Sequence, residues 1–222
     1  MKKILIGLGV LVVLAGAVVT WWTYEFPSAT WRYKITVEVE TPEGIKMGSA
    51  VREVHVQYAP TIGDIPTTSV NVKGEAVVID LGERGVIFST ISGYDILFRA
   101  FPYSKGGLTK EGMNYYSQLE HAQKSLLKLD IVPQFLMFKN LEDPFSVKQL
   151  DVLNLRRDFG AGVNIKDIII ETTNAPVTWG IVDRYLPWLK RQKGGYLGGG
   201  ATSRGAPLGL HTGYFQTGVK ND

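Results

Sequence analysis

The chain has 222 residues, of which 45% are hydrophobic and 20% are charged, so a fully disordered chain is excluded. It contains no cysteine, which excludes disulfide bonds, thiolate metal sites and cysteine nucleophiles. The net charge is +3, and without Lys2 and Lys3 the rest of the chain carries only +1. A nearly neutral domain is a poor binder of polyanions, so we expect no nucleic acid among its partners.

An uncharged stretch of 19 residues, 4–22, stands near the N-terminus. As an α-helix it is about 28 Å long, close to the hydrocarbon thickness of a bilayer. Lys2 and Lys3 precede it, which predicts a cytoplasmic N-terminus, and Trp21 and Trp22 are typical of an outer interfacial belt. The sequence therefore predicts a single-pass inner-membrane anchor, embedded in the lipid bilayer through residues 4–22, with the C-terminal domain in the periplasm.

A cleaved secretory signal is the alternative interpretation of this stretch. Ala15-Gly16-Ala17 forms an A-x-A site after an apolar core, as a signal peptidase requires. Both interpretations export everything that follows. A lipoprotein is excluded, because no cysteine follows Leu14-Ala15-Gly16.

A short tether is predicted over residues 23–30, where Pro27 and Ser28 prevent continuation of the helix. Apolar and polar side chains then alternate from Trp31 to Glu40, which predicts a strand with one buried face. The turn Thr41-Pro42-Glu43-Gly44 leads to a second strand, Val51–Tyr58, so the two strands read as an antiparallel hairpin. The expected inward residues of this hairpin are Trp31, Tyr33, Ile35, Val37, Val39, Val54, Val56 and Tyr58.

Further strands and about three helices are predicted along the rest of the chain. The predicted strands are Glu75–Leu81, Val86–Ile91, a central strand Phe135–Phe138 buried on both faces, and Val163–Thr172 with a bulge near Asp167. The predicted helices are 110–121, capped by Thr109, a short one from Asp151 to Gly160, and one that starts at Thr178 and carries Ile181, Val182, Tyr185 and Trp188.

This order of elements predicts an α+β fold with a mainly antiparallel sheet. The predicted organisation is an anchor at 1–22, a tether at 23–30, a periplasmic α+β domain at 31–193, and a glycine-rich tail at 194–222.

The motifs of metal and nucleotide sites do not occur. His55, His121 and His211 are far apart in the sequence and form no His-x-x-x-His pair, so we expect no metal site. Gly107 and Gly112 have P-loop spacing, but Met113-Asn114 replaces the required Lys-Ser/Thr. We therefore expect neither a nucleotide nor any other cofactor.

Two weak catalytic patterns remain. Ser125-Leu126-Leu127-Lys128 matches the S-x-x-K motif of penicillin-binding enzymes, but the partner motifs of that family are missing, which favours a solvated helix end. Glu38 and Glu40 share a strand face at a spacing of about 7 Å, which suits an inverting glycosidase and is also typical of any wet strand face. We assign no catalytic residue.

The segments Trp31–Glu53, Gly74–Gly85 and Gly160–Glu171, with the turns at Pro144 and Pro176-Val177-Thr178, resemble a group of uncharacterised envelope proteins of alphaproteobacteria. Members of this group pair a signal, lipobox or single anchor with one small exported domain. The resemblance implies a compartment and one domain, but no activity and no site residue. The chain departs from the lipid-anchored members because it has no lipobox cysteine.

These observations favour a non-enzymatic protein that binds another envelope protein, as an accessory subunit of a larger membrane complex. An immunity-type protein against a periplasmic toxin, a sensor of an envelope ligand and a carboxylate-based envelope hydrolase are the alternatives. The tail favours a partner, because apolar residues stand among its glycines; as a docking arm it would bind through Leu208, Leu210, Tyr214 and Phe215. The tail folding back on its own domain is the other possibility.

Overall fold

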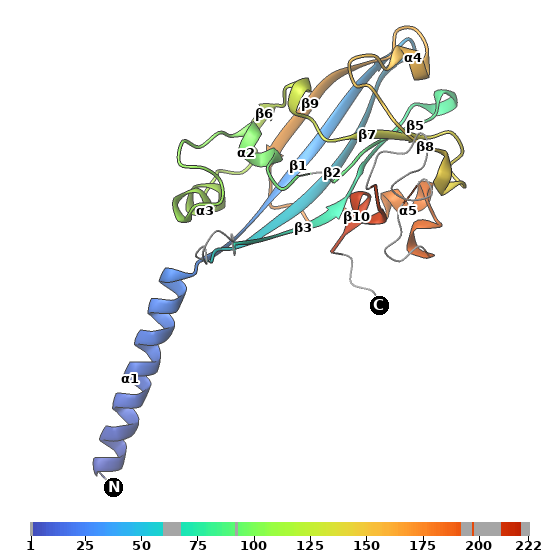
Figure 1. The fold of residues 1–222 in the computed structure, drawn as a ribbon. Helices are drawn as coiled ribbons and strands as arrows, with labels where there is room; N and C mark the ends of the chain where they lie inside the picture. Colours follow the sequence, from blue (N-terminus) through green and yellow to red (C-terminus); the bar gives the residue numbers. More distant parts are fainter. Residues whose placement is uncertain (1, 60–67, 92, 192–196, 198–209, 219–222) are drawn as a thin grey trace.

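The computed structural model describes residues 2–59, 68–91, 93–191, 197 and 210–218, with side chains given from Gly9 onward except at residue 131. Within these residues the fold is α+β, with five α-helices and two antiparallel sheets, as predicted (Figure 1). The helices are α1 (Lys2–Glu25), α2 (Ile96–Ala100), α3 (Lys110–Ser117), α4 (Arg156–Phe159) and α5 (Ile181–Tyr185). The strands are β1 (Ser28–Thr41), β2 (Gly44–Gln57), β3 (Ser69–Glu75), β4 (Val77–Asp80), β5 (Val86–Ser89), β6 (Lys124–Leu126), β7 (Phe135–Phe138), β8 (Val147–Gln149), β9 (Asn164–Thr172) and β10 (Gln216–Thr217).

Helix α1 projects away from the domain, and its described apolar side chains are exposed on all sides, from Val10 to Tyr24 (Figure 1). Across the described part of the chain, no helix reaches the combined length and apolarity that crossing a membrane requires. The helix ends at Glu25, and β1 begins at Ser28, so the tether predicted over residues 23–30 is wrong. Pro27 does end the helix, but the chain enters the sheet at once.

The junction between α1 and the domain is held by specific contacts. The Phe26 ring packs against that of Trp22, with 4.6 Å between ring centroids, and the Tyr58 N–H donates to the Pro27 carbonyl at 3.0 Å. Lys110, in the first turn of α3, pairs with Glu25 at 3.2 Å and lies over the Tyr58 ring. These contacts place the base of the domain directly against the end of α1.

The hairpin of β1 and β2 is the centre of the larger sheet, whose strand order is β10-β3-β2-β1-β9-β6. The predicted alternation is confirmed: Tyr33, Ile35, Val37 and Val39 are completely buried, and Trp31 is 6% exposed. On β2, Val54 and Val56 point to the same buried face, whereas Tyr58 lies just beyond the strand and is only half-buried.

The bulge predicted near Asp167 is also confirmed. Strand β9 pairs with β1, and the register shifts between Glu38 and Val39, so that Lys166 is the extra residue on β9. The Lys166 ammonium lies 2.9 Å from the Glu38 carboxylate on the outer face of the sheet. The phase change in the sequence of β9 therefore marks a real insertion in the ladder.

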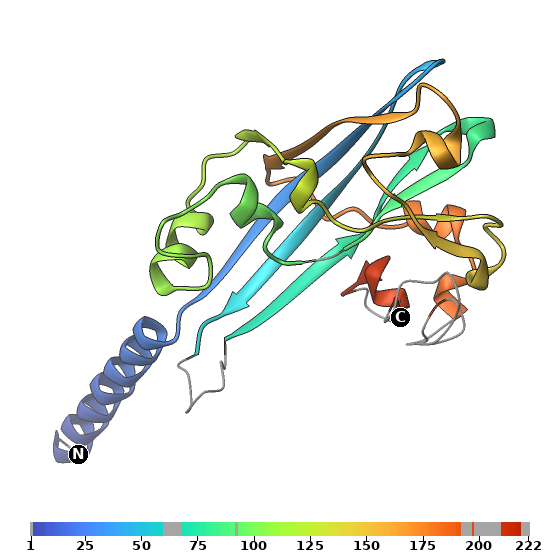
Figure 2. The ribbon, with the colours of Figure 1, turned by 45° about the horizontal axis from the view of Figure 1, so that its top comes forward.

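The smaller sheet, in the order β4-β5-β7-β8, packs across the larger one (Figure 2). A Cβ atom built on Gly48 of β2 would lie 2.0 Å from the Val78 carbonyl of β4, so glycine is required where the two sheets cross. Strand β7 is central in this sheet, as predicted, with Phe135, Leu136 and Phe138 buried.

Several short elements were not predicted: α2, β3, β6, β8 and β10. The segment Asn71–Gly74, which we interpreted as a turn, belongs to β3 and pairs with the outer part of β2. Helices α4 and α5 are shorter than expected. The Asp151 carboxylate accepts the Leu153 N–H in a turn before α4, and Thr178 bonds to the backbone of Val51 instead of starting α5.

The C-terminal tail folds back on its own domain, which corrects the prediction of a docking arm. Phe215 is completely buried and Leu210 is 2% exposed, both in the core of the smaller sheet. The Phe215 carbonyl accepts the Ala76 N–H at 2.8 Å, and β10 pairs with β3. Tyr214 is half-buried, and Leu208 lies outside the described residues. Leu210 and Phe215 are thus core residues, because their apolar surface is already used within the domain.

Replacing Phe215 by Ala tests this arrangement. We expect a loss of about 3–5 kcal/mol, because a buried aromatic ring leaves a cavity, which lowers the Tm of the full-length chain by roughly 10 °C. Phe145, which is 62% exposed, is the matched control, and its change to Ala should cost less than about 0.5 kcal/mol. Equal Tm values for the two variants in a thermal melt would contradict the fold-back of the tail.

Candidate functional site

The catalytic patterns of the sequence are not assembled into a site. Ser125 lies in a strand, β6, so Lys128 three residues later does not share a helical face with it. The Glu38 carboxylate is engaged by Lys166, and Glu40 is exposed. In the part of the chain that the structure describes, no group of three or more histidines and carboxylates is placed to hold a metal ion.

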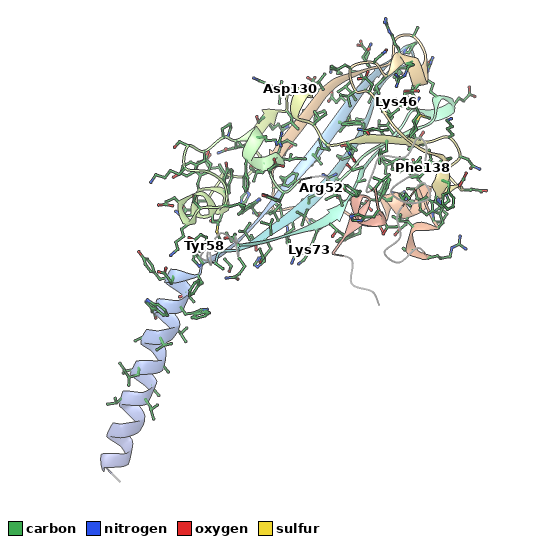
Figure 3. The ribbon with its side chains drawn as sticks, viewed as in Figure 1. Lys46, Arg52, Tyr58, Lys73, Asp130 and Phe138 are labelled. Carbon is green, nitrogen blue, oxygen red and sulfur yellow. The ribbon has the colours of Figure 1, made fainter. Side chains whose placement is uncertain are left out.

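A buried polar cluster lies between the two sheets, around Arg52 (Figure 3). Arg52 is completely buried on the inner face of β2. Its Nε donates to the Glu75 carbonyl at 3.1 Å, and its Nη2 donates to the Ser89 carbonyl at 3.2 Å. One side chain of the larger sheet therefore binds the end of β3 and the end of β5.

Glu75 extends this cluster to α5. Its buried carboxylate accepts the backbone N–H groups of Ile181 at 3.1 Å and Val182 at 3.3 Å, at the start of the helix. These two N–H groups have no partner within a helix, and a carboxylate there also opposes the helix dipole. Arg52 lies close enough to Glu75 for the two charges to stabilise each other.

Three polar atoms of the cluster have no hydrogen-bond partner among the described residues: Nη1 of Arg52, the Tyr33 hydroxyl and the Ser89 hydroxyl. Burial raises the pKa of Tyr33, although the neighbouring Arg52 acts in the opposite direction. Burial lowers the pKa of the Arg52 guanidinium, and the nearby Tyr33 and Glu75 oppose this effect. The cluster connects the sheets and does not open into either described pocket that lines the surface.

Sequence reasoning missed Arg52, although a signal existed. Val54 and Val56 were assigned to the inner face of β2, and the two-residue period of a strand places Arg52 on that same face. A charged residue in such a position was passed over because charged side chains are almost never fully buried unless paired. Its partners come from β3 and β5, which the period of β2 does not reveal.

Replacing Arg52 by Met tests the cluster. We expect a loss of about 3–5 kcal/mol, because the Glu75 carboxylate then remains buried without its opposite charge. Arg156→Met, at an exposed position, is the matched control and should change stability by less than about 0.5 kcal/mol. In chemical denaturation, Arg52→Met with Glu75→Gln should cost less than the sum of the two single changes; strict additivity would show that the two charges do not interact.

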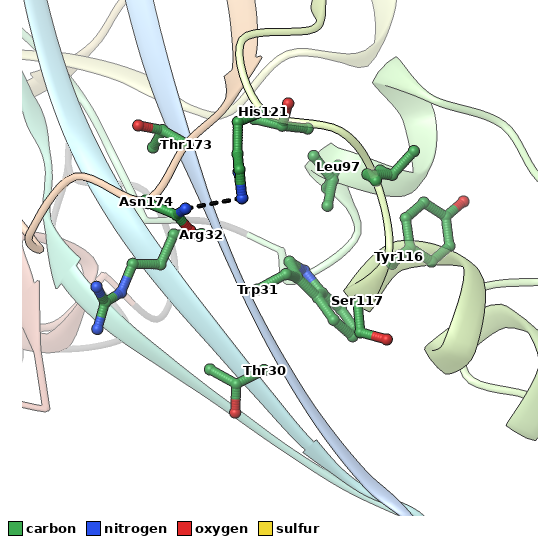
Figure 4. A pocket seen from close by; sticks show the side chains of 11 residues that line it. Thr30, Trp31, Arg32, Leu97, Tyr116, Ser117, His121, Thr173 and Asn174 are labelled. Carbon is green, nitrogen blue, oxygen red and sulfur yellow. Dashed lines mark hydrogen bonds between the residues drawn. The ribbon is translucent and has the colours of Figure 1, made fainter.

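A pocket of about 80 Å³ lies at the edge of the larger sheet, between β1, the end of β9, α2 and α3 (Figure 4). Thr30, Trp31 and Arg32 of β1 line one wall, and Tyr116 and Ser117 of α3 lie opposite. The Tyr116 hydroxyl donates to the Phe101 carbonyl at 2.8 Å, and burial raises the pKa of Tyr116 to about 12. The tyrosine is therefore neutral at physiological pH and holds α3 in place.

Polar groups from distant parts of the chain meet in this pocket. Nδ2 of Asn174, just after β9, lies 2.7 Å from Nε2 of His121 (Figure 4). The Trp31 indole nitrogen is buried and has no acceptor among the described residues. Arg32 bonds to Glu53 at 2.8 Å, and Lys73 pairs with the other oxygen of that carboxylate at 3.1 Å.

The three histidines have different positions. His121 lines the pocket, and the ring of His55 bonds through Nδ1 to the Thr30 hydroxyl, which lines it too. His211 accepts the Gly213 N–H in a local turn of the tail. The sequence order gave no sign that His121 and Asn174 face each other across 53 residues.

The pocket exists because the ladder between β1 and β9 stops early. Tyr33 pairs with Thr172, and the last bond runs from the Thr173 N–H to the Arg32 carbonyl at 3.2 Å. The backbone groups of Thr30 point to the same edge as those of Arg32, because alternate residues of a strand share an edge. In the described structure no strand continues opposite Thr30, so this edge of β1 is open.

Comparison of the chain with protein-family models, with curated proteins and with solved structures gives no match in any of the three. Functional inference therefore depends on the geometry of the chain itself.

Proposed function

We propose that the protein is a single-pass inner-membrane protein whose α+β domain lies in the periplasm. In this proposal the domain works without catalysis, as an accessory subunit that binds another envelope protein. The observation that carries the binding function is an exposed apolar pair, Ile45 and Met47, which are 50% and 63% exposed at the end of the β1–β2 hairpin.

The membrane location is supported by α1. The uncharged stretch 4–22 includes residues 4–8, which precede the first described side chain, and continues through a helix that is apolar on every side. The 24 residues of α1 span about 36 Å, against a hydrocarbon thickness of about 30 Å. Trp21 and Trp22 are more than half exposed where an interfacial belt would lie, and Lys2 and Lys3 precede the stretch.

The partner-binding surface is supported by its distance from α1. Figures 1 and 2 place the hairpin end and α1 at opposite ends of the domain. Strand β1 has 14 residues, so the hairpin end lies roughly 45 Å from the end of α1. Ile45 and Met47 point to the outer face of the sheet, beside Glu40 and Glu38 across the hairpin. Two adjacent exposed apolar side chains at such a position favour contact with another protein.

A charge in the middle of α1 tests the membrane location. We expect Val13→Arg to move the full-length chain from the carbonate-resistant membrane fraction to the soluble fraction or to aggregates, because a central arginine costs about 2.5–3.5 kcal/mol on insertion. Ile45→Arg is the matched control and should leave the chain in the membrane fraction. A reporter fused after Asp222 should be active only in the periplasm, and a mature N-terminus at Val18 would contradict an uncleaved anchor.

Affinity purification from solubilised membranes tests the binding function. We expect the full-length chain to recover a stoichiometric envelope protein, and Ile45→Arg with Met47→Arg to lose it, because two charges cannot enter an apolar contact. Leu126→Arg, at another exposed apolar position, should retain the partner. Recovery of an exported toxin would favour the immunity alternative, and unchanged recovery by the double variant would contradict this surface.

A further inference from the structure

The pocket at the open edge of β1 has a positively biased lining. Its eleven lining residues include Arg32 and His121 and no aspartate or glutamate. Glu120, next to His121 in the sequence, is exposed and is not among them. Arg32, Glu53 and Lys73 form one ion-paired group with a net charge of +1, so Glu53 does not cancel the positive charge beside the pocket. Such a lining favours an anionic ligand.

Hydrogen-bond donors also predominate in the pocket. The Trp31 indole N–H can only donate, and it is buried without an acceptor among the described residues. Asn174 presents its Nδ2 to Nε2 of His121, so Nε2 accepts and the ring proton is on Nδ1, a further donor. The hydroxyl of Ser117 adds another group that can donate.

The size of the pocket limits the ligand. One water molecule needs roughly 10–15 Å³ on the measure that gives about 80 Å³ here, so the pocket has space for a group of several atoms. A phosphate group has five heavy atoms and only acceptor oxygens when ionised, and therefore matches both the space and the donors.

We propose that this pocket binds a phosphate group, held by the Trp31 indole, the Arg32 guanidinium and the His121 ring. The phosphate belongs either to a soluble molecule or to a lipid headgroup, since β1 begins only three residues after α1. This site is separate from the hairpin surface, and its occupation does not depend on the proposed protein partner.

The indole signals in an NMR spectrum report directly on the site. The chain has five tryptophans, and Trp31→Phe identifies the Trp31 signal in the full-length chain held in neutral detergent micelles. We expect inorganic phosphate to shift this signal until saturation, while that of Trp188, whose nitrogen donates to the Leu141 carbonyl at 2.6 Å, stays fixed.

Matched variants then locate the binding. Arg32→Gln and His121→Ala should each weaken phosphate binding by about tenfold, since each removes a hydrogen bond to a charged group. Arg191→Gln removes an exposed charge elsewhere and should leave the binding unchanged. The other four indole signals show whether each variant is folded. Equal binding by all three variants would overturn the proposal.

A second titration distinguishes the two sources of phosphate. Phosphatidic acid is added to the micelles in place of inorganic phosphate. A saturable shift of the Trp31 signal with inorganic phosphate assigns the site to a soluble ligand, and a shift with the lipid alone assigns it to a headgroup. A Trp31 signal that moves with neither probe, or moves without saturation, overturns the proposal. None of these outcomes depends on the membrane-fraction or purification experiments.

Discussion

The buried guanidinium of Arg52 is the constraint on which the arrangement of the two sheets depends. A charge in a dry interior is tolerated only where its hydrogen bonds are supplied, and here they come from the backbone at Glu75 and Ser89. These two carbonyls belong to the ends of β3 and β5, so satisfying Arg52 fixes where the smaller sheet crosses the larger one. The Glu75 carboxylate repeats this requirement at the start of α5. Polar satisfaction therefore positions elements that apolar packing alone leaves free to slide.

Much of the fold is readable from local pattern. The alternation from Trp31 to Glu40 gives both the strand and its buried face, because a one-residue shift would expose every apolar side chain of β1. The same period, broken near Asp167, reveals the bulge in β9. The apolar run Phe135–Phe138 indicates a central strand, since both of its faces are covered.

The remainder depends on contacts between distant residues. Strands β6 and β8 have three residues each and β10 has two, too few to show a period, and each forms only against a longer neighbour. Phe215 stands in a glycine-rich segment that has no pattern of its own, and its place in the core is set by Ala76 and Phe88. The pocket was equally hidden, because His121 and Asn174 meet only when β9 stops at Thr172.

The proposed sites share one rigid element. Strand β1 starts at the end of α1, lines the pocket at Thr30–Arg32, packs Tyr33 beside Arg52, and ends at the hairpin that carries Ile45 and Met47. From Tyr33 onward it is paired on both sides, so it has no second conformation that a ligand at Thr30 could select. A ligand shifts an equilibrium only when two states bind it differently. Binding in the pocket and binding at the hairpin are therefore independent, and β1 serves to hold both surfaces at fixed heights above α1.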